Sequence, residues 1–304
     1  MNIVEENIPD LNNEPPKFKK LLYPIPKHKN VQKPYFIMAA IGQRGSGKTF
    51  SIVRMLKNCE EKGGYIDPID GEKVEIRHVL FSPTFKGNPV FTALKHLDED
   101  DIINEYTEQK LYEVLEEIKY DREQTEKFKK YKHAYIRYSK MSDKQIQRCK
   151  DYEFLALLHE FNFIKPDKLS HQFKYQGRHC VTNIILDDCL GGDAFNTKRK
   201  SLLVKAILNS RHYGINVIIA AQNLKSINKA IRTNVDIWVL FKFKSTKIIL
   251  DDLYEEISGM LSIEEFLHLY NYATLKDNDA FVIDGKAEKE DKFKLNFDTI
   301  LKLK

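Results

Sequence analysis

One short segment constrains the fold of this chain more than any other, the eight residues from Gly42 to Thr49. They read Gly-Gln-Arg-Gly-Ser-Gly-Lys-Thr and follow the apolar run 35–41. Residues 50–59 contain no Pro or Gly and repeat apolar side chains at helical spacing. A strand, a glycine-rich loop and a helix in this order turn backbone N–H groups around phosphate oxygens. The segment therefore predicts a nucleoside triphosphate site within an α/β fold.

The individual residues of this loop have distinct expected roles. Lys48 is expected to reach the β- and γ-phosphates of ATP, and the Thr49 hydroxyl is expected to bind Mg²⁺. A glycine-rich turn that binds nothing is the alternative, but the pattern rarely arises by chance between a strand and a helix. The residues predicted to contact ATP are Gly42, Gln43, Arg44, Gly45, Ser46, Gly47, Lys48, Thr49 and Phe50.

The composition is that of a globular chain. Its 304 residues, 42% of them hydrophobic, suffice for one large α/β domain or two small ones. No apolar run approaches the roughly 18 to 20 residues that span a bilayer, and the N-terminus lacks a basic region followed by an apolar stretch. We therefore expect no membrane segment and a soluble intracellular protein. The four cysteines lack metal-ligand spacing, which favours reduced structural thiols.

The first 34 residues differ from the rest of the chain. They contain six prolines and little periodicity, which predicts an extended arm. Between Pro15 and Cys59 there is no acidic residue, whereas ten are Lys or Arg. A basic segment of this kind contacts a phosphate backbone or an acidic partner, or it is a flexible solvated arm.

Residues 35–285 are predicted to form the main domain. Its strands are indicated by nearly continuous Ile, Val, Leu and Phe, as in strands that are buried on both faces of a mostly parallel sheet with flanking helices. These runs are 35–41, 79–82, 181–187, 215–221, 237–243 and 280–283.

Three further segments complete the predicted organisation. Residues 98–167 are dense in charge and Tyr with helical spacing, which predicts a helical insertion that serves as solvated helices, a lid or a partner surface. Ser262 and Glu265 form a capping box that opens a later helix. Residues 286–304 form a lysine-rich tail, for which we expect a terminal helix or a frayed end.

Polar residues that end two of the predicted strands extend the candidate site. Asp187 and Asp188 follow an apolar strand, so Asp187 is expected to hold Mg²⁺ and Asp188 to orient or deprotonate the attacking water. Gln222 ends the next strand, where ligands bind in doubly wound folds, and could sense the γ-phosphate. A strand-end residue that only caps a turn or bonds a loop is the alternative for each.

Two arginines flank the strand that ends in Gln222. Arg211 precedes this strand and Arg232 follows it, and either could stabilise the charge that develops on the transferred phosphoryl group. The alternative for each is a surface salt bridge. Lys198, Arg199, Lys200 and Lys205 make the preceding helix basic, either for DNA contact or as a solvated face.

The order of these elements resembles the FtsK/HerA superfamily of DNA-pumping ATPases, and within it the genome-packaging ATPases of large double-stranded DNA viruses and virophages. The resemblance lies within residues 35–285, and the insertion at 98–167 matches nothing in the family. It is carried by GQRGSGKT at 42–49, LFSPT at 80–84, IILDD at 184–188, NSRHYGINVIIAAQ at 209–222, IRTNVDIWVLF at 231–241 and YEEISGMLSIEEF at 254–266.

The resemblance implies a RecA-like (ASCE) P-loop core in which one strand separates the loop strand from the acidic strand. Lys48 and Thr49 match the family's nucleotide loop, Asp187 and Asp188 its acidic pair, and Gln222 its polar sensor. It also implies a ring of five or six copies that hydrolyses ATP to move along double-stranded DNA. The implied partners are capsid or portal-vertex proteins, and the implied location is the host cytoplasm, at a viral factory, or the virion.

Three other functions use the same loop. A GTP switch would fit Asp188-x-x-Gly191, but no N-K-x-D element follows, since Asn228-Lys229 precedes Ala-Ile. A nucleoside or metabolite kinase would normally be shorter and would need an Arg-rich lid. A non-motor ATPase would use ATP only to assemble, and it differs from a motor in that DNA would not stimulate hydrolysis.

Overall fold

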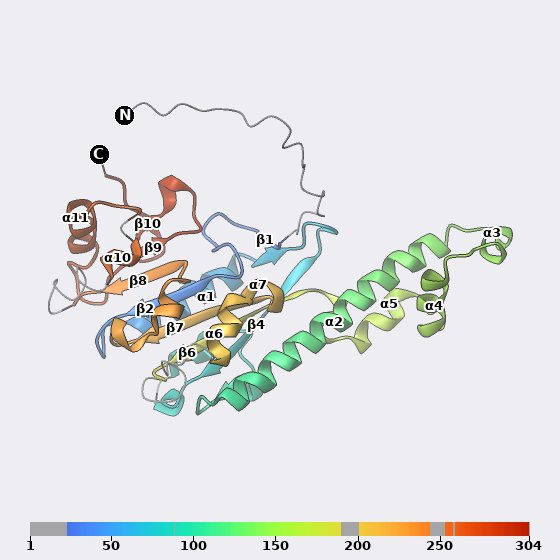
Figure 1. The fold of residues 1–304 in the computed structure, drawn as a ribbon, viewed down its shortest axis with the longest axis horizontal. Helices are drawn as coiled ribbons and strands as arrows, with labels where there is room; N and C mark the ends of the chain where they lie inside the picture. The colour runs from blue at the N-terminus through green and yellow to red at the C-terminus, as the bar shows by residue number, and fades with distance from the viewer. Residues whose placement is uncertain (1–22, 88, 190–200, 244–252, 258, 304) are drawn as a thin grey trace, which may run out of the picture.

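The computed structural model of the chain describes residues 23–87, 89–189, 201–243, 253–257 and 259–303 (Figure 1). Most of the predicted basic arm lies outside these ranges, as do Lys198, Arg199 and Lys200. None of the described helices is both long and apolar enough to cross a membrane. The four cysteines are free thiols.

The described residues form one sheet with the strand order β1-β3-β4-β6-β7-β2-β8-β9-β10-β11, and β5 pairs with β4. The strands are β1 (Ile25–Pro26), β2 (Ile37–Ile41), β3 (Tyr65–Ile66), β4 (Lys73–Phe81), β5 (Ile102–Ile103), β6 (Cys180–Asp187), β7 (Ile215–Ala221), β8 (Ile237–Phe241), β9 (Ala280–Asp284), β10 (Phe293–Leu295) and β11 (Thr299–Ile300).

The α-helices are α1 (Lys48–Glu61), α2 (Glu108–Tyr138), α3 (Asp143–Gln147), α4 (Tyr152–Glu160), α5 (Pro166–Leu169), α6 (Leu202–Leu208), α7 (Ser210–Tyr213), α8 (Lys229–Arg232), α10 (Tyr254–Ile257) and α11 (Ile263–Ala273). The capping box predicted at Ser262 and Glu265 is present at the start of α11.

The sheet is mixed, so the prediction of a mostly parallel sheet is wrong. Its centre is parallel, since β4, β6, β7, β2 and β8 pair side by side in the same direction. Both edges are antiparallel, formed by β9, β10 and β11 on one side and by β3 and β1 on the other. The connections between β9, β10 and β11 are short, and short connections join only antiparallel neighbours.

The order of the central strands agrees with the resemblance. β7 pairs with both β2 and β6, so one strand separates the loop strand from the strand that ends in Asp187. All of these strands point the same way. Their carboxyl ends, and the loops that follow them, therefore lie along one edge of the sheet.

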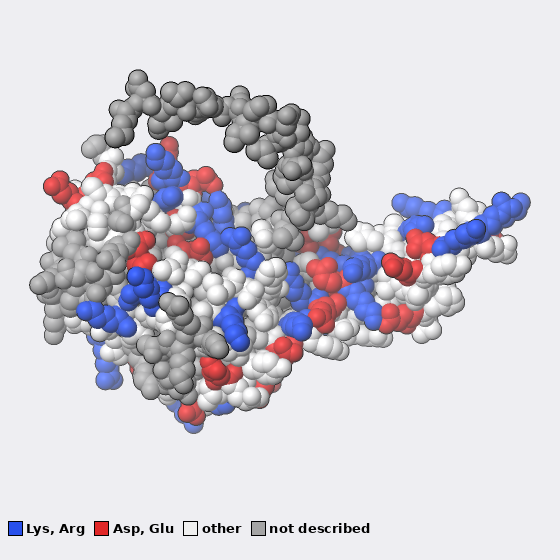
Figure 2. Space-filling model, in the orientation of Figure 1, with Lys and Arg blue, Asp and Glu red and all other residues white. Residues whose placement is uncertain are grey.

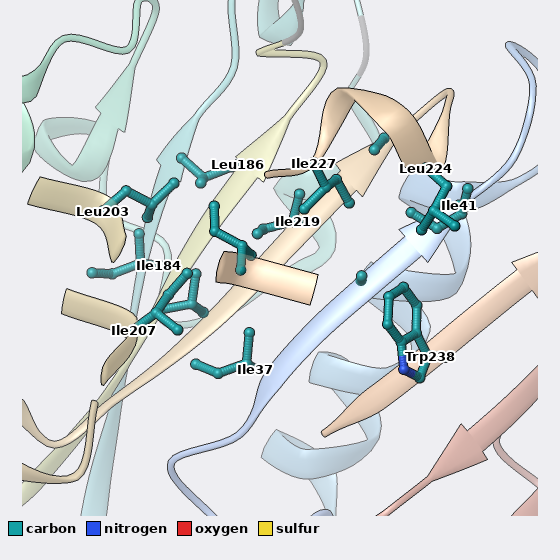
Figure 3. Packing of buried hydrophobic residues seen from close by; sticks show 14 of the residues in the cluster. Ile37, Ile41, Ile184, Leu186, Leu203, Ile207, Ile219, Leu224, Ile227 and Trp238 are labelled. Atoms are coloured by element: carbon teal, nitrogen blue, oxygen red, sulfur yellow. The ribbon is translucent and has the colours of Figure 1, made fainter. Parts of the chain in front are cut away.

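Alternate residues of the central strands pack on opposite faces, because the side-chain period of a strand is two. On one face, Ile184 and Leu186 pack with Leu203 and Ile207 of α6, and Figure 3 shows these side chains between the strands and the helix. On the other face, Ile185 packs in a second cluster that includes the buried side of α1. Both faces are covered, so the strands are apolar throughout.

The end of the chain extends the sheet. For residues 286–304 the expectation of a terminal helix or a frayed end is wrong, since Phe293–Leu295 and Thr299–Ile300 form β10 and β11. The alternation of Phe293, Lys294 and Leu295 is the period of a strand. Lys294 is buried, and its charge is paired with Asp284.

A buried row of polar side chains crosses the sheet and was not foreseen. Asn183 Nδ2 donates to His78 Nδ1 over 3.1 Å, and Asn216 Nδ2 donates to Asn183 Oδ1 over 2.8 Å. At its ends, His78 Nε2 lies 3.0 Å from Glu60 Oε1, and Asn216 Oδ1 accepts from the backbone N–H of Phe36. The row links β4, β6 and β7 to α1 and to the start of β2.

Removing the middle of this row is expected to destabilise the fold. Asn183→Ala leaves two buried groups without a partner, which should lower the free energy of unfolding by about 2 to 4 kcal/mol. Urea denaturation followed by fluorescence of Trp238, the one tryptophan of the chain, measures this change. Asn209→Ala, which removes an exposed amide, is the control and should cost less than about 0.5 kcal/mol. Equal losses would contradict the role of the row.

Candidate functional site

The loop between β2 and α1 has a backbone that requires glycine. Gly45 and Gly47 have φ of 79° and 95°, in the left-handed region. A Cβ on Gly42 would lie 2.5 Å from Ser46 Oγ and 2.7 Å from Phe241 Cβ. Gly47 caps α1 without a side-chain hydrogen bond, so the first N–H groups of this 14-residue helix are left for a ligand. The geometry suits an anion.

Lys48 lies over the loop and is held by it. Its Nζ donates to the carbonyl oxygens of Gly42 over 2.7 Å and of Gln43 over 2.9 Å. Burial lowers the pKa of Lys48, and the nearby carboxylates of Asp187 and Asp188 oppose that shift. A triphosphate in the loop would offer this ammonium stronger, charged acceptors than the two carbonyls.

Thr49 and Asp187 face each other across the loop. Thr49 Oγ1 lies 3.3 Å from both carboxylate oxygens of Asp187, to which it donates. Burial and, to a lesser extent, the neighbouring Asp188 raise the pKa of Asp187 to about 6, although the Thr49 hydrogen bond and Lys48 oppose the shift. A bound cation would lower the pKa of Asp187 again, because it stabilises the charged carboxylate.

Asp188 and Gln222 also meet at this edge of the sheet. Gln222 Nε2 donates to Asp188 Oδ1 over 3.1 Å, from the end of the adjacent strand. Asp188 has a φ of 54°, which is uncommon for a residue other than glycine. This backbone turn follows directly on β6, and the carboxylate of Asp188 is half-buried beside the loop.

These residues surround one cavity of about 660 Å³. Its volume lies within the roughly 300 to 1,000 Å³ that small-molecule sites usually have. The cavity lining brings together the loop, both acids and Gln222, as the sequence predicted. It is formed by Arg44, Gly45, Gly47, Lys48, Thr49, Phe50, Pro83, Thr84, Gly87, Val90, Asp187, Asp188, Ala220 and Gln222.

Some neighbours of the loop were not predicted as site residues. Pro83 and Thr84 follow β4, whose carboxyl end lies at the same edge of the sheet as that of β6. Their position after a predicted strand was the signal that could have identified them. Asn278 lies beside Gly47, with its Cβ 3.3 Å from the position of an added Cβ. It comes from the loop between α11 and β9, and no sequence pattern connects it to the site.

Arg211 lies at the opposite edge of the sheet. It belongs to α7, which precedes β7, and it lines a different cavity together with Ile37 at the start of β2. Seven residues of β7 separate this edge from Gln222, which is about 20 Å at the usual rise of a strand. Arg211 therefore does not reach the loop of its own chain.

Arg232 also lies apart from the loop cavity. Its Nε is 3.5 Å from Glu256 Oε1 of α10, and its Nη1 donates to the carbonyl of Leu224 over 3.5 Å. It is absent from the residues that line the cavity. The structure thus places nine of the predicted site residues at the cavity and both arginines elsewhere; the nine are Arg44, Gly45, Gly47, Lys48, Thr49, Phe50, Asp187, Asp188 and Gln222.

The residues at the loop fit Mg²⁺ only together with a phosphate ligand. Within the described ranges, no group of three or more His, Cys, Asp or Glu could hold a metal ion by itself. Thr49 Oγ1 and Asp187 supply two hard oxygens, and phosphate oxygens and water would complete the octahedron that Mg²⁺ prefers. The Ser46 hydroxyl is buried in the loop without a hydrogen-bond partner among the described residues, which leaves it free for a phosphate.

Comparison with known proteins gave the following similarities. No family model matches the chain. It is 30% identical over 120 residues to the uncharacterised protein 075L of Invertebrate iridescent virus 6, a match that covers 38% of this chain and 45% of that protein. The alignment thus spans less than half the length of this relative.

Several solved structures are also similar to the chain. The genome packaging NTPase B204 from Sulfolobus turreted icosahedral virus 2, in complex with ATP-gammaS, is 12% identical with a TM-score of 0.41, over 86% of this chain and 97% of that one. EssC (ATPases 2 and 3) from Geobacillus thermodenitrificans is 12% identical with a TM-score of 0.43, over 87% and 40%. The cytoplasmic domain of the type VII secretion ATPase EccC from Thermomonospora curvata is 14% identical with a TM-score of 0.40, over 87% and 28%.

A viral genome packaging NTPase, the kind of protein that the sequence resembles, is therefore among the similar structures.

The raised pKa of Asp187 predicts a pH-dependent gain in stability when its charge is removed. A folded-state pKa of about 6 against an ordinary 3.8 means that the carboxylate destabilises the ligand-free fold fully above pH 6, and this penalty disappears as the pH falls towards 4. Asp187→Asn should therefore raise the free energy of unfolding at pH 8 by up to about 3 kcal/mol, since one pKa unit corresponds to about 1.4 kcal/mol.

Urea denaturation with a chelator present, at pH 4 and pH 8, measures this gain. The control is Asp277→Asn, which removes an exposed carboxylate in the same way. A gain of the same size at both pH values would show that something other than the Asp187 charge is responsible.

Proposed function

We propose that this protein is a Mg²⁺-dependent ATP hydrolase. The observation that carries the proposal is the convergence of Lys48, Thr49, Asp187, Asp188 and Gln222 on one cavity, from the ends of three adjacent parallel strands. A glycine turn without a ligand would have no need of two acids and a half-buried lysine at the same edge of the sheet. The charge of Asp187, which burial penalises, also supports a cation as part of the ligand.

Each residue has a role that its position allows. The N–H groups of the loop and of the start of α1 bind the phosphates, and Lys48 exchanges its two carbonyl acceptors for phosphate oxygens. Thr49 and Asp187 hold Mg²⁺, which neutralises charge on the β- and γ-phosphates when bound. Asp188 orients the attacking water and accepts its proton. Gln222, bonded to Asp188, positions that carboxylate and senses the γ-phosphate.

We further propose that hydrolysis drives movement along double-stranded DNA during packaging of a viral genome. The support is the order of motifs from the loop to the segment 231–241, together with the strand inserted between β2 and β6. This function requires a ring of copies, five or six in the resembling family, and capsid or portal-vertex proteins as partners. Its place is the host cytoplasm, at a viral factory, or the virion.

In such a ring the arginines would act on a neighbouring subunit. Arg211 lies about 20 Å from the loop of its own chain, at the amino end of β7, and in the described part of the chain it forms no ion pair. Arg232 is bound to Glu256 and is less available. We propose Arg211 as the better candidate for an arginine that stabilises the transferred phosphoryl group in trans, with Arg232 as the alternative.

Replacing the loop lysine tests the enzymatic proposal. Lys48→Ala should reduce ATP hydrolysis by at least about a hundredfold, because it removes the ammonium that the loop holds near both acids, whereas the other cation of the loop, Arg44, is exposed. Thermal unfolding should stay nearly unchanged. Phosphate release by purified protein measures the rate. Lys57→Ala, on the exposed side of the same helix, is the control and should keep the wild-type rate. Unchanged hydrolysis by Lys48→Ala would refute the assignment of the site.

Duplex DNA tests the proposed coupling. A motor should hydrolyse ATP several-fold faster when double-stranded DNA is present, whereas an ATPase that serves only assembly should not respond. The measurement is the rate of phosphate release with and without duplex DNA, together with the mass of the protein in solution. Equal rates in a preparation that has assembled would favour the assembly switch.

Mixed assemblies test the arginines. Arg211→Ala subunits keep an intact loop, and Lys48→Ala subunits keep an intact arginine, so a mixture should regain hydrolysis that neither parent shows. Mixtures with Arg232→Ala subunits serve as the comparison. If no mixture containing Arg211→Ala regains activity while both parents assemble, Arg211 does not act in trans.

A further inference from the structure

A helical arm projects from the sheet and has a hydrophobic core of its own (Figure 1). The first half of α2 packs on the main core through Leu111 and Leu115. Its second half belongs to a separate cluster, formed by Phe128, Tyr131, Ala134, Phe154, Leu158 and Leu169. α2 has 31 residues and is therefore about 45 Å long. Aromatic contacts such as Tyr131 with Phe161, at 4.4 Å between ring centroids, fix the returning segment against it.

The charges along the shaft of this arm are mostly neutralised. Between residues 127 and 137 there are five Lys or Arg residues, and all but Lys130 pair with a carboxylate. Those pairs are Lys127 with Glu160, Lys129 with Asp67, Lys132 with Glu72, and Arg137 with Asp151. The basic character of the shaft is thus accounted for within the chain.

The end of the arm, residues 139–150, is different, and we call it the basic tip. It carries Lys140, Lys144, Arg148 and Lys150 against one acid, Asp143. All four cations are exposed, and none forms an ion pair with any residue that the structure describes. Figure 2 shows Lys and Arg side chains gathered at the far end of the arm.

The basic tip is held in a defined shape. Ser142 and Gln145 form a reciprocal capping box that starts α3. Met141 and Cys149 pack against the aromatic core of the arm, which anchors both sides of α3. A long arm with its own core thus presents four cations that pair with no described carboxylate, Lys144 on α3 and the other three beside it.

The composition of the basic tip indicates a phosphate backbone as its partner. Protein interfaces place apolar and aromatic anchors at their centre and are depleted in Lys. The apolar side chains of the tip, Met141, Ile146 and Cys149, are all half-buried, so no apolar anchor is exposed there. Tyr152, just beyond the tip, is 78% exposed, and its hydroxyl can donate to phosphate as Lys and Arg do.

The basic tip lies far from the nucleotide site. At the start of α2, Glu108 accepts from the N–H of Leu202, the first residue of α6, which follows β6 in the chain. Halfway along, Arg122 of α2 donates to the carbonyl of His212, next to the amino end of β7. α2 therefore runs from the carboxyl edge of the sheet to the amino edge, and the tip extends beyond that edge. Substitutions in the tip do not touch the loop cavity.

We propose that the basic tip binds the phosphate backbone of double-stranded DNA. This surface lies outside the segments that carry the family resemblance, and the proposal rests on the proposed function for the presence of DNA. Contacts of this kind release counterions from the duplex, so they depend on salt and not on base sequence. The tip thereby adds a DNA contact at the side of the molecule opposite to the site of hydrolysis.

The test compares two sets of four substitutions in the full chain. The tip variant combines Lys140→Ala, Lys144→Ala, Arg148→Ala and Lys150→Ala. The control variant combines Lys62→Ala, Lys95→Ala, Lys119→Ala and Lys289→Ala, which remove four exposed lysines outside the basic tip and outside residues 1–34 and change the net charge equally. Binding to a 30-base-pair duplex is measured by fluorescence anisotropy between 50 and 200 mM salt, and ATP hydrolysis is measured without DNA.

We expect the tip variant to bind the duplex about tenfold or more weakly than the control variant at the lowest salt. Its slope of log Kd against log salt should be smaller by about 1 to 4, since each lost phosphate contact removes about 0.9. Lys144→Glu combined with Arg148→Glu should weaken binding at least as much. Both four-site variants should hydrolyse ATP at the wild-type basal rate.

Equal affinities and slopes for the tip and control variants would overturn the proposal for the tip and leave the proposed function intact. The same holds if the tip variant keeps duplex binding and loses only binding to an acidic protein. Wild-type protein that hydrolyses ATP but binds no duplex at any salt would overturn the DNA-translocating function, and the tip proposal with it.

Discussion

The parallel pairing of β6, β7 and β2 is the constraint on which the rest of the structure depends. Asp187 pairs with Ala220, and Ile41 pairs with Ala221, so the three strands end at the same level of the sheet. The pairing continues into the loop, where the N–H of Gly42 donates to the carbonyl of Ala221 over 3.1 Å. The buried polar row fixes the register of β6, because a slip would separate Asn183 from His78 and Asn216.

The register brings opposite charges into a small, partly buried space. Without a ligand, the loop carbonyls satisfy the ammonium of Lys48, while Asp187 carries a penalty for its charge. A bound triphosphate would give Lys48 charged acceptors in place of the two carbonyls, and Mg²⁺ would remove the cost of the Asp187 charge. The charge of Asp187 therefore destabilises the ligand-free fold and favours binding of a charged ligand, as expected for a functional site.

The sequence was enough to predict the central strands of the sheet and the site residues that lie at their ends. β2, β6 and β7 were predicted because doubly buried strands are continuously apolar, and the polar residues at their ends were predicted to meet. The direction of β9 was not predictable, since its fully buried run reads like a parallel strand. The distance of Arg211 from the loop, and the contact of Asn278 with Gly47, depend on tertiary placement that no local pattern encodes.

The central claim is that the loop at 42–49 binds a triphosphate with Mg²⁺, and a structure of the protein with Mg²⁺ and a non-hydrolysable ATP analogue tests it most directly. The account predicts the γ-phosphate within hydrogen-bond distance of Lys48 Nζ, with the two loop carbonyls released, and the metal beside Thr49 Oγ1 and Asp187. An analogue bound elsewhere, or a Lys48 that keeps its bonds to Gly42 and Gln43 with the analogue present, would contradict it.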